Sequence, residues 1–146
     1  MLIPIKKLSQ TAILPTQGTS EAAGWDLYAD GLPGHAYKIP PHTTIKIGTG
    51  LAVAIPAGFA GFIYARSGLA TNQGLAPANK VGVIDSDYRG ELIVALHNDL
   101  DFVVSVKAGD RIAQMIVQKI VRCEFVPLDR LDETERGVGG FGSTGV

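Results

Sequence analysis

Short runs of apolar and β-branched residues, separated every few positions by glycine or proline, dominate the hydrophobic pattern of the chain. Eighteen glycines and eight prolines interrupt its 146 residues. Short strands at such regular spacing are typical of all-β sandwiches, jelly rolls and barrels. The runs that we expect to form strands are 25–29, 43–47, 51–55, 59–65, 81–84, 91–97 and 102–107.

The strand expected over 91–97 is mostly apolar on both faces. Ile93, Ala95 and His97 share one face, while the residues at 92, 94 and 96 are leucine, valine and leucine. Such a strand is typical of burial on both sides, or on one side against another chain. Oligomerisation is therefore one interpretation of this pattern.

Residues 110–126 contain no glycine or proline and suit either a helix or a strand. Ile112, Ile116 and Ile120 recur at helical spacing, whereas most odd positions from Ala113 to Phe125 are apolar, as in a strand. Enrichment in isoleucine and valine favours the strand. One short helix is expected elsewhere, beginning at Ser67 as its N-cap and running to Gly74.

Residues 81–91, VGVIDSDYRGE, place a polar tip after an apolar run, and a second apolar run follows. This arrangement predicts a β-hairpin. Such a tip would hold Asp85 and Tyr88 in fixed relation and expose backbone groups with which a flat heterocycle could pair. A solvated turn is the alternative, because Asp and Ser favour turns for local hydrogen-bonding reasons alone.

The last eleven residues, RGVGGFGSTGV, contain five glycines. They predict a flexible C-terminal arm over 136–146, separate from a single domain over 1–135. Most glycine-rich ends are frayed termini. This one also carries an arginine, a phenylalanine and a Ser-Thr pair, which are residue types that bind phosphate and cover an aromatic ring.

Composition narrows the possible functions. The net charge is −1, from 13 basic and 14 acidic residues, and no basic stripe indicates a nucleic-acid polymer or an anionic membrane. No segment reads as a signal peptide or as a membrane span. Cys123 is the single cysteine, so neither an internal disulfide nor a zinc cluster is expected. We expect a soluble intracellular protein, cytoplasmic by default, with a nuclear, organellar or viral origin left open.

Five segments, in order along the chain, resemble the motifs of the trimeric dUTP pyrophosphatases (dUTPases). Each is weak alone, but the ordered set is specific. The resemblance implies a jelly-roll-like β-barrel assembled as a homotrimer, with each active site between subunits and covered by the arm of a third. The segments are AGWDLYA (23–29), ARSGLA (65–70), NKVGVIDSDYRG (79–90), GDRIAQMIV (109–117) and RGVGGFGSTG (136–145).

The resemblance also implies the reaction: hydrolysis of dUTP to dUMP and pyrophosphate by water attack on the α-phosphorus. This keeps uracil out of DNA and supplies dUMP for thymidylate synthesis. Asp85 matches the catalytic carboxylate, which would act as general base on the water. Tyr88 matches the tyrosine that packs under deoxyribose and excludes a 2′-hydroxyl. Uracil would be bound by Asn79 and by backbone groups of Gly82, Val83 and Ile84.

The remaining segments match positions that contact the phosphates or a metal. Mg²⁺ would be chelated mainly by the triphosphate. Asp26 would meet this ion through water, although an ion pair with a neighbouring arginine is the alternative reading. Phe141 would stack over uracil. The phosphate-binding positions implied are Arg66, Ser67, Gly68, Gln114, Arg136, Gly142, Ser143 and Thr144.

Three other functions were weighed. A dCTP deaminase would carry a glutamate ten residues after Asp85, where this chain has Ala95, and would lack the fifth segment. A nucleotide-sensing module that controls a protein partner would not need the complete catalytic set, although the sequence leaves a second, regulatory role open. A purely structural trimer would leave the arm without a purpose.

Overall fold

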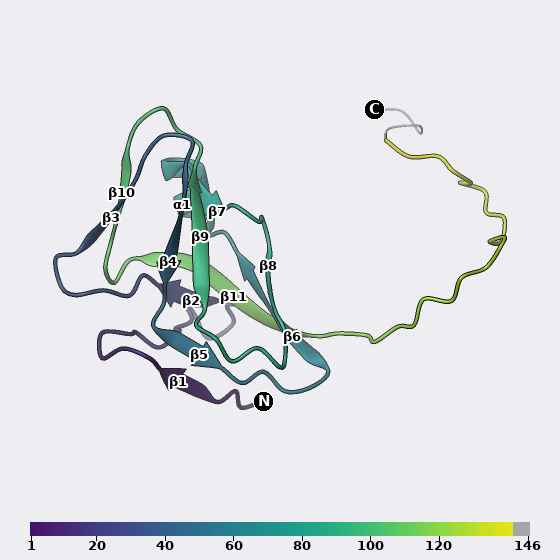
Figure 1. Cartoon of the computed structure of the whole chain (residues 1–146), viewed down its shortest axis with the longest axis horizontal. Coiled ribbons are helices and arrows are strands. Elements are labelled where there is room, and N and C mark those ends of the chain that lie inside the picture. Colours follow the sequence, from purple (N-terminus) through teal and green to yellow (C-terminus); the bar gives the residue numbers. More distant parts are fainter. Residues whose placement is uncertain (142–146) are drawn as a thin grey trace.

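The computed structural model describes residues 1–141, which form eleven strands and one helix (Figure 1). The helix has seven residues and no helix of these residues could span a membrane. The elements in chain order are β1 (Ile5–Lys7), β2 (Trp25–Tyr28), β3 (Ala36–Ile39), β4 (Thr44–Gly48), β5 (Leu51–Val53), β6 (Phe59–Tyr64), α1 (Ser67–Gln73), β7 (Leu75–Pro77), β8 (Gly82–Ile84), β9 (Ile93–Asn98), β10 (Val104–Lys107) and β11 (Arg111–Lys119).

The strands form four antiparallel sheets. The largest has the order β2-β11-β6-β8, the next β4-β9-β7, and two further pairs are β1-β5 and β10-β3. The expected all-β, jelly-roll-like class with one short helix is therefore confirmed, although the sheets of residues 1–141 do not close into one continuous barrel. Residues 120–141 lie beyond the last strand, and Figure 1 shows them running away from the sheets.

All seven expected strands are present, with ends that differ by a few residues. Within residues 110–126 the structure has strand β11 over Arg111–Lys119, so the strand prediction is confirmed for these residues and the helical alternative was wrong, while residues 120–126 form no strand. Strands β1, β3 and β7 were not expected from the sequence. Each contains a proline or lies directly next to one (Pro4, Pro40 and Pro77), which gave these segments the pattern of loops.

The predicted hairpin around Asp85 is wrong in its pairing. Strand β8 pairs with β6, whereas β9 pairs with β4 and β7 in a different sheet. Residues 85–92 are thus a crossing between two sheets rather than the turn of one hairpin. The alternation of apolar residues predicts that a run is a strand, but it does not choose the partner strand.

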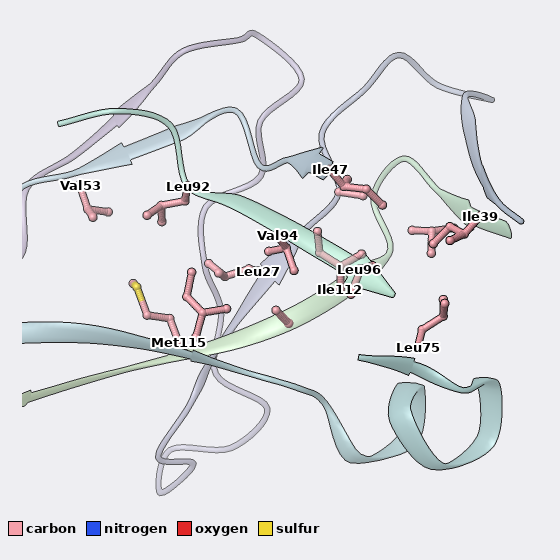
Figure 2. Packing of buried hydrophobic residues seen from close by; sticks show 14 of the residues in the cluster. Leu27, Ile39, Ile47, Val53, Leu75, Leu92, Val94, Leu96, Ile112 and Met115 are labelled. Carbon is pink, nitrogen blue, oxygen red and sulfur yellow. The ribbon is translucent and has the colours of Figure 1, made fainter. Parts of the chain in front are cut away.

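The core lies between the two larger sheets (Figure 2). Leu92, Val94 and Leu96 point into it, while Ile93 on the opposite face of β9 is 45% exposed. Only one face of this strand is therefore buried within a single chain. Trp25 lies on β2, the edge strand of its sheet, and is 43% exposed.

Helix α1 begins one residue earlier than its predicted cap implies. Arg66 occupies the N-cap in an extended conformation and makes no side-chain cap bond, so the prediction that Ser67 caps the helix is wrong. The C-terminal end agrees with expectation, because Gly74 adopts the left-handed conformation at φ 60°. A Cβ atom at Gly74 would also lie only 2.6 Å from Cγ of Leu100.

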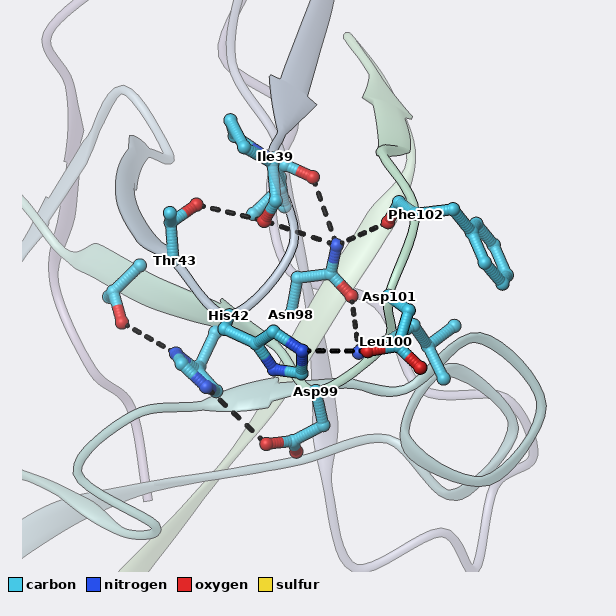
Figure 3. Close-up of polar contacts among 11 residues, drawn as sticks. Ile39, His42, Thr43, Asn98, Asp99, Leu100, Asp101 and Phe102 are labelled. Atoms are coloured by element: carbon cyan, nitrogen blue, oxygen red, sulfur yellow. Dashed lines mark hydrogen bonds and ion pairs between the residues drawn. The ribbon is translucent and has the colours of Figure 1, made fainter.

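A buried amide joins the end of β3 to the loop between β9 and β10 (Figure 3). The side chain of Asn98 is fully buried, and its Nδ2 lies within hydrogen-bond distance of the carbonyl oxygens of Ile39, Pro40 and Phe102, at 3.0, 3.2 and 2.8 Å. Its Oδ1 accepts from the backbone N–H of Leu100 at 2.9 Å. One side chain thus joins the end of β3 to the loop after β9.

Two carboxylates hold the turn between β4 and β5. The buried N–H of Gly50 donates to Oε1 of Glu91 at 2.7 Å, and Asp30 packs against Gly50 from another side, where it accepts from the Thr11 hydroxyl at 2.7 Å. Burial opposes ionisation of Asp30, but hydrogen bonds from Ser9, Thr11 and a backbone N–H outweigh it, so the pKa of this carboxyl lies below its usual value.

Tyr37 gives the fold a measurable alkaline pH dependence. Its hydroxyl donates to the backbone carbonyl of Asp30 at 2.6 Å. Burial, followed by the negative charges of Asp30 and Glu91, raises the pKa of Tyr37 above 10.0. The folded state therefore keeps this proton more tightly than the unfolded chain, and the stability that it contributes is lost as the pH rises above about 10.

We expect Tyr37→Phe to lower the free energy of unfolding at pH 8 by about 1 kcal/mol, because one hydrogen bond is lost. Between pH 8 and pH 11 the difference from the original protein should shrink, because phenylalanine has no proton to release. Urea unfolding at both pH values checks this, with Tyr28→Phe as the control. A difference that stays constant would contradict the raised pKa.

Candidate functional site

A cavity of about 280 Å³ lies where the chain crosses from β8 to β9. Its volume is close to the lower end of the range for small-molecule sites, about 300–1,000 Å³. The cavity lies between the four-stranded sheet and the three-stranded sheet and is lined by residues of both. The lining residues are Ile63, Pro77, Asn79, Gly82, Val83, Ile84, Asp85, Tyr88, Glu91, Ile93, Val94 and Ala95.

One wall of the cavity is the edge of a sheet. Strand β8 pairs with β6 on one side only, so its other side presents backbone N–H and C=O groups. Gly82 allows the amide of Asn79 to lie close, because a Cβ atom there would be 3.3 Å from Asn79 Nδ2. A backbone edge and a side-chain amide together offer donors and acceptors to a planar ligand.

Asp85 follows β8 directly and lies exposed at the mouth of the cavity. Its backbone carbonyl accepts from the N–H of Tyr88 at 3.2 Å, so the two residues are held in one turn. The neighbouring carboxylate of Asp87 is exposed and does not line the cavity. The carboxylate and the aromatic ring that the sequence singled out therefore share one small site.

The ring of Tyr88 is held by its own loop. Its hydroxyl donates to the backbone carbonyl of Glu91 at 3.0 Å. A Cβ atom at Gly90 would lie 2.5 Å from Cζ of this ring, so only glycine leaves room for the ring here. The hydrogen bond from the Tyr88 side chain to the Glu91 backbone thus closes a short loop, and both of these residues line the cavity.

A second hollow, of about 380 Å³, lies beside helix α1 and includes Arg66, Gly68 and Arg111 among its lining residues. Nε of Arg66 and Nη1 of Arg111 donate to the two carboxylate oxygens of Asp26, at 2.7 and 3.2 Å. The Asp26 side chain is only 13% exposed. Its ion pairing with arginine, the alternative raised from the sequence, is what the single chain shows.

The other expected phosphate-binding residues are spread over the surface. Gln114 is half-buried on β11, where its Nε2 donates to the carbonyl of Ala65 at 2.9 Å, and Ser67 is exposed at the start of α1. In the arm, Nε of Arg136 donates to the carbonyl of Gly139 at 2.9 Å, and Phe141 is fully exposed. Three expected residues lie outside the described part of the chain: Gly142, Ser143 and Thr144.

The structure thus divides the expected site into parts. The base-binding and sugar-binding positions and Asp85 line the first cavity, whereas Arg66 and Gly68 line the second, and the two share no lining residue. Sequence reasoning did not single out Arg111 or Glu91. Arg111 lies inside the GDRIAQMIV segment and Glu91 directly follows the third segment, and these positions were the only signals available.

The antiparallel β fold thus holds a small cavity that combines a strand edge, an amide and a carboxylate, and a separate hollow lined by arginines, an arrangement suited to a small ligand with a planar group. The chain belongs to the dUTPase family, because the model of that family matches residues 10–145.

Individual relatives agree with this assignment. The deoxyuridine 5′-triphosphate nucleotidohydrolase of Desulfitobacterium hafniense is 54% identical over 134 residues, which cover 91% of this chain and 87% of the relative. A mutant of the Staphylococcus bacteriophage 80alpha dUTPase, solved with dUpNHpp, superposes with a TM-score of 0.90 at 26% identity and 99% coverage of both chains. A mutant dUTPase from phage phi11 of S. aureus, described with a structural Mg(II) ion, has a TM-score of 0.77 at 22% identity, over 89% of this chain and 98% of that one.

Proposed function

We propose that this protein hydrolyses dUTP to dUMP and pyrophosphate, with Asp85 as the general base on the attacking water. Family membership and the relative from Desulfitobacterium hafniense, named a deoxyuridine 5′-triphosphate nucleotidohydrolase, support the reaction. The observation that carries the assignment of roles is the single cavity that gathers Asn79, the edge of β8, Asp85 and Tyr88. A carboxylate at the mouth of such a site can accept a proton from water held within hydrogen-bond reach.

The base would be recognised by the edge of β8 together with Asn79. Uracil presents an N–H donor between two carbonyl acceptors, which the backbone of Gly82, Val83 and Ile84 and the side-chain amide can match. Cytosine reverses part of this pattern and would leave buried polar groups unpaired, a mismatch that binding sites reject strongly. Thymine would bring a methyl group against the cavity wall.

The phosphates would be bound by a second copy of the chain. Arg66, Ser67, Gly68 and Gln114 do not line the cavity that holds Asp85, so one subunit supplies only part of the site. The exposed face of β9 is apolar at Ile93, which also lines the first cavity. A homotrimer that covers this face would place the arginine-lined hollow of one subunit next to the base-binding cavity of another.

The C-terminal arm would close the site after the nucleotide binds. Arg136 supplies a cation for the terminal phosphates, and the backbone amides of Gly142, Ser143 and Thr144 supply further donors. Phe141 is fully exposed in the single chain and is free to stack over the base. Closure of this kind excludes bulk water and fixes the attacking geometry.

Magnesium would enter with the substrate. Among residues 1–141 no group of three metal-binding side chains is present, and both oxygens of Asp26 accept from arginines. This donor set does not suit a metal held by protein side chains alone, whereas Mg²⁺ readily keeps its waters and takes its ligands from phosphates. The bound ion would neutralise charge on the triphosphate. Contact of Asp26 with it through water remains a prediction.

Pyrophosphate release from dUTP, UTP, dCTP and dTTP, measured side by side, tests the proposed function. We expect dUTP to exceed each of the others by at least about 10³-fold in kcat/KM, because the mismatched nucleotides leave polar groups unpaired or clash. Tight binding of dUTP without pyrophosphate would favour the sensor, and ammonia from dCTP would favour the deaminase. A deaminase would carry its glutamate at position 95. In this chain that position is Ala95, which lines the cavity and has no carboxylate.

We expect Tyr88→Ala to raise the use of UTP relative to dUTP by about tenfold, because the ring no longer excludes a 2′-hydroxyl. The kcat/KM ratio for the two nucleotides is the measurement. Tyr64→Ala, at a tyrosine that does not line the cavity, is the matched control. An unchanged ratio in Tyr88→Ala would remove this residue from sugar selection.

A further inference from the structure

The position of the Tyr88 ring depends on a backbone atom of Glu91. The Tyr88 hydroxyl donates to the Glu91 carbonyl at 3.0 Å, and the absent side chain of Gly90 leaves the space that the ring occupies. A shift of Glu91 would move the acceptor and allow the ring to follow it. The placement of the ring is therefore only as rigid as the placement of Glu91.

Glu91 is itself fastened through its side chain to a distant part of the chain. Its Oε1 accepts from the buried N–H of Gly50 at 2.7 Å, in the turn between β4 and β5. A Cβ atom at Gly48 would lie 3.0 Å from Cδ of Glu91, so this glycine makes room for the carboxylate. The end of β4 and the turn after it thus contact the carboxylate at two positions, 43 and 41 residues away in the sequence.

The same turn also holds the next residue. The backbone N–H and the hydroxyl of Thr49 both donate to the Leu92 carbonyl, at 3.1 and 2.8 Å, and the Leu92 N–H donates to Leu51 at 2.8 Å. Leu92 is fully buried in the core. Hydrogen bonds to Thr49 and Leu51 therefore fix the backbone at Leu92 without any contribution from Glu91. The carboxylate of Glu91 fixes one further residue, which lines the cavity.

No ion pair of the described residues includes Glu91, although it lines a cavity proposed to bind an anionic nucleotide. A negative charge at that place does not favour a triphosphate. The carboxylate does accept a hydrogen bond from a buried N–H that would otherwise be left unpaired. Its contribution is thus that of a hydrogen-bond acceptor, which a neutral amide of the same length can also supply.

We propose that Glu91 is a positioning residue, which sets the discrimination between deoxyribose and ribose by fastening the Tyr88 loop to the turn between β4 and β5. This inference rests on the proposed role of Tyr88 against the sugar. Glu91 acts through the ring and does not itself touch the reacting atoms. Sugar selection is accordingly controlled from a turn that lies outside the five family segments.

The test compares Glu91→Ala, Glu91→Asp and Glu91→Gln by the ratio of kcat/KM for dUTP and UTP. We expect Glu91→Ala to lower this ratio by about tenfold, because small displacements of a positioning group have large kinetic effects. Glu91→Asp is one methylene too short to reach Gly50 and should also lower it, which keeps the test valid if the alanine variant does not fold. Glu91→Gln should retain the ratio within about twofold, because it keeps the acceptor.

Thr11→Val is the matched control. It removes a hydrogen bond to Asp30 on another side of Gly50 and does not touch the Tyr88 loop, so the ratio should stay unchanged. An equal fall of the ratio in Thr11→Val and Glu91→Ala would show that the effect is general loosening of the turn. An unchanged ratio in both Glu91→Ala and Glu91→Asp would overturn the proposal.

A second readout separates this proposal from the role of Tyr88 itself. The four tyrosines can be labelled with 3-fluorotyrosine, and Tyr88→Phe assigns the ¹⁹F resonance of Tyr88. We expect that resonance to shift in Glu91→Ala and Glu91→Asp but not in Glu91→Gln. A shifted resonance with unchanged sugar selection would mean that Glu91 positions the ring but that the ring does not select the sugar. An unmoved resonance would refute the positioning role directly.

Discussion

Replacement of Asp85 by asparagine is expected to lower the turnover of dUTP by about 10²- to 10⁴-fold, the usual contribution of a general base. Asparagine has the same shape but cannot take a proton from water. Asp85 is exposed, so we expect the stability to change by less than about 0.5 kcal/mol. The affinity for dUpNHpp should stay within about an order of magnitude, as measured by calorimetry beside an assay of pyrophosphate release.

Asp87→Asn is the matched control for this experiment. Asp87 lies two residues away, is also exposed and does not line the cavity, so its replacement changes the same charge without touching the site. We expect its turnover to stay within about twofold of the original protein, as for other surface changes. An original rate in Asp85→Asn, or an equal loss in Asp87→Asn, would end the candidacy of Asp85.

Deletion of residues 136–146 is expected to leave a folded protein that turns over dUTP at least about a hundredfold more slowly. Among the described residues, none beyond Val117 belongs to the core or packs against it, so residues 136–141 contribute nothing to the packed interior. The loss of activity follows because Arg136 and its charge-assisted hydrogen bonds, worth about 1.5–3 kcal/mol each, can no longer form. Light scattering should give the same number of subunits as for the full chain, and an assay of pyrophosphate release measures the rate.

Arg130→Ala is the control for loss of a cation near the arm. Arg130 forms an exposed ion pair with Glu133 at 2.8 Å and lies outside the deleted residues. Its replacement should leave the rate within about twofold, since exposed ion pairs contribute little. If the truncated chain keeps its full rate, the arm is a frayed terminus and has no part in catalysis.

Alternating apolar runs and breakers were sufficient to predict the fold class. The seven strands that they located have no proline within them or directly next to them. They could not locate β1, β3 and β7, each of which contains or directly adjoins a proline and so has the pattern of a loop. Nor could they predict that β8 and β9 belong to different sheets, because pairing is decided by contacts distant in sequence.

The grouping of the expected base-binding residues in one cavity was predictable because they are local in sequence. Asn79, the edge of β8, Asp85 and Tyr88 lie within ten residues, and one loop brings them together. The residues expected to bind the phosphates could be chosen only by residue type, since they lie on α1, β11 and the arm. The contact of Glu91 with Gly50 has no local signal at all, because it joins two turns of the fold through a single side chain.

The cap of α1 shows a different kind of limit. Serine is favoured at N-caps because its oxygen can accept from a free N–H of the first turn. Here the helix follows closely after the end of β6. Arg66 is the N-cap residue, with the extended conformation φ −90° and ψ 130°, so Ser67 is already the first residue of the helix. The pairing with Asp26 holds Arg66 in place. The helix thus begins at a residue that the local preference for a serine cap does not predict.

The surroundings of Gly50 limit which substitutions this position can accept. Its φ of 65° disfavours any side chain, and a Cβ atom would lie 2.7 Å from Asp30 and 2.8 Å from Ala12. Variation at this site therefore has to follow prior substitutions at its neighbours, which makes the order of mutations matter. Libraries that aim at a new nucleotide preference would gain more from varying position 91 than from randomising the glycines that face it.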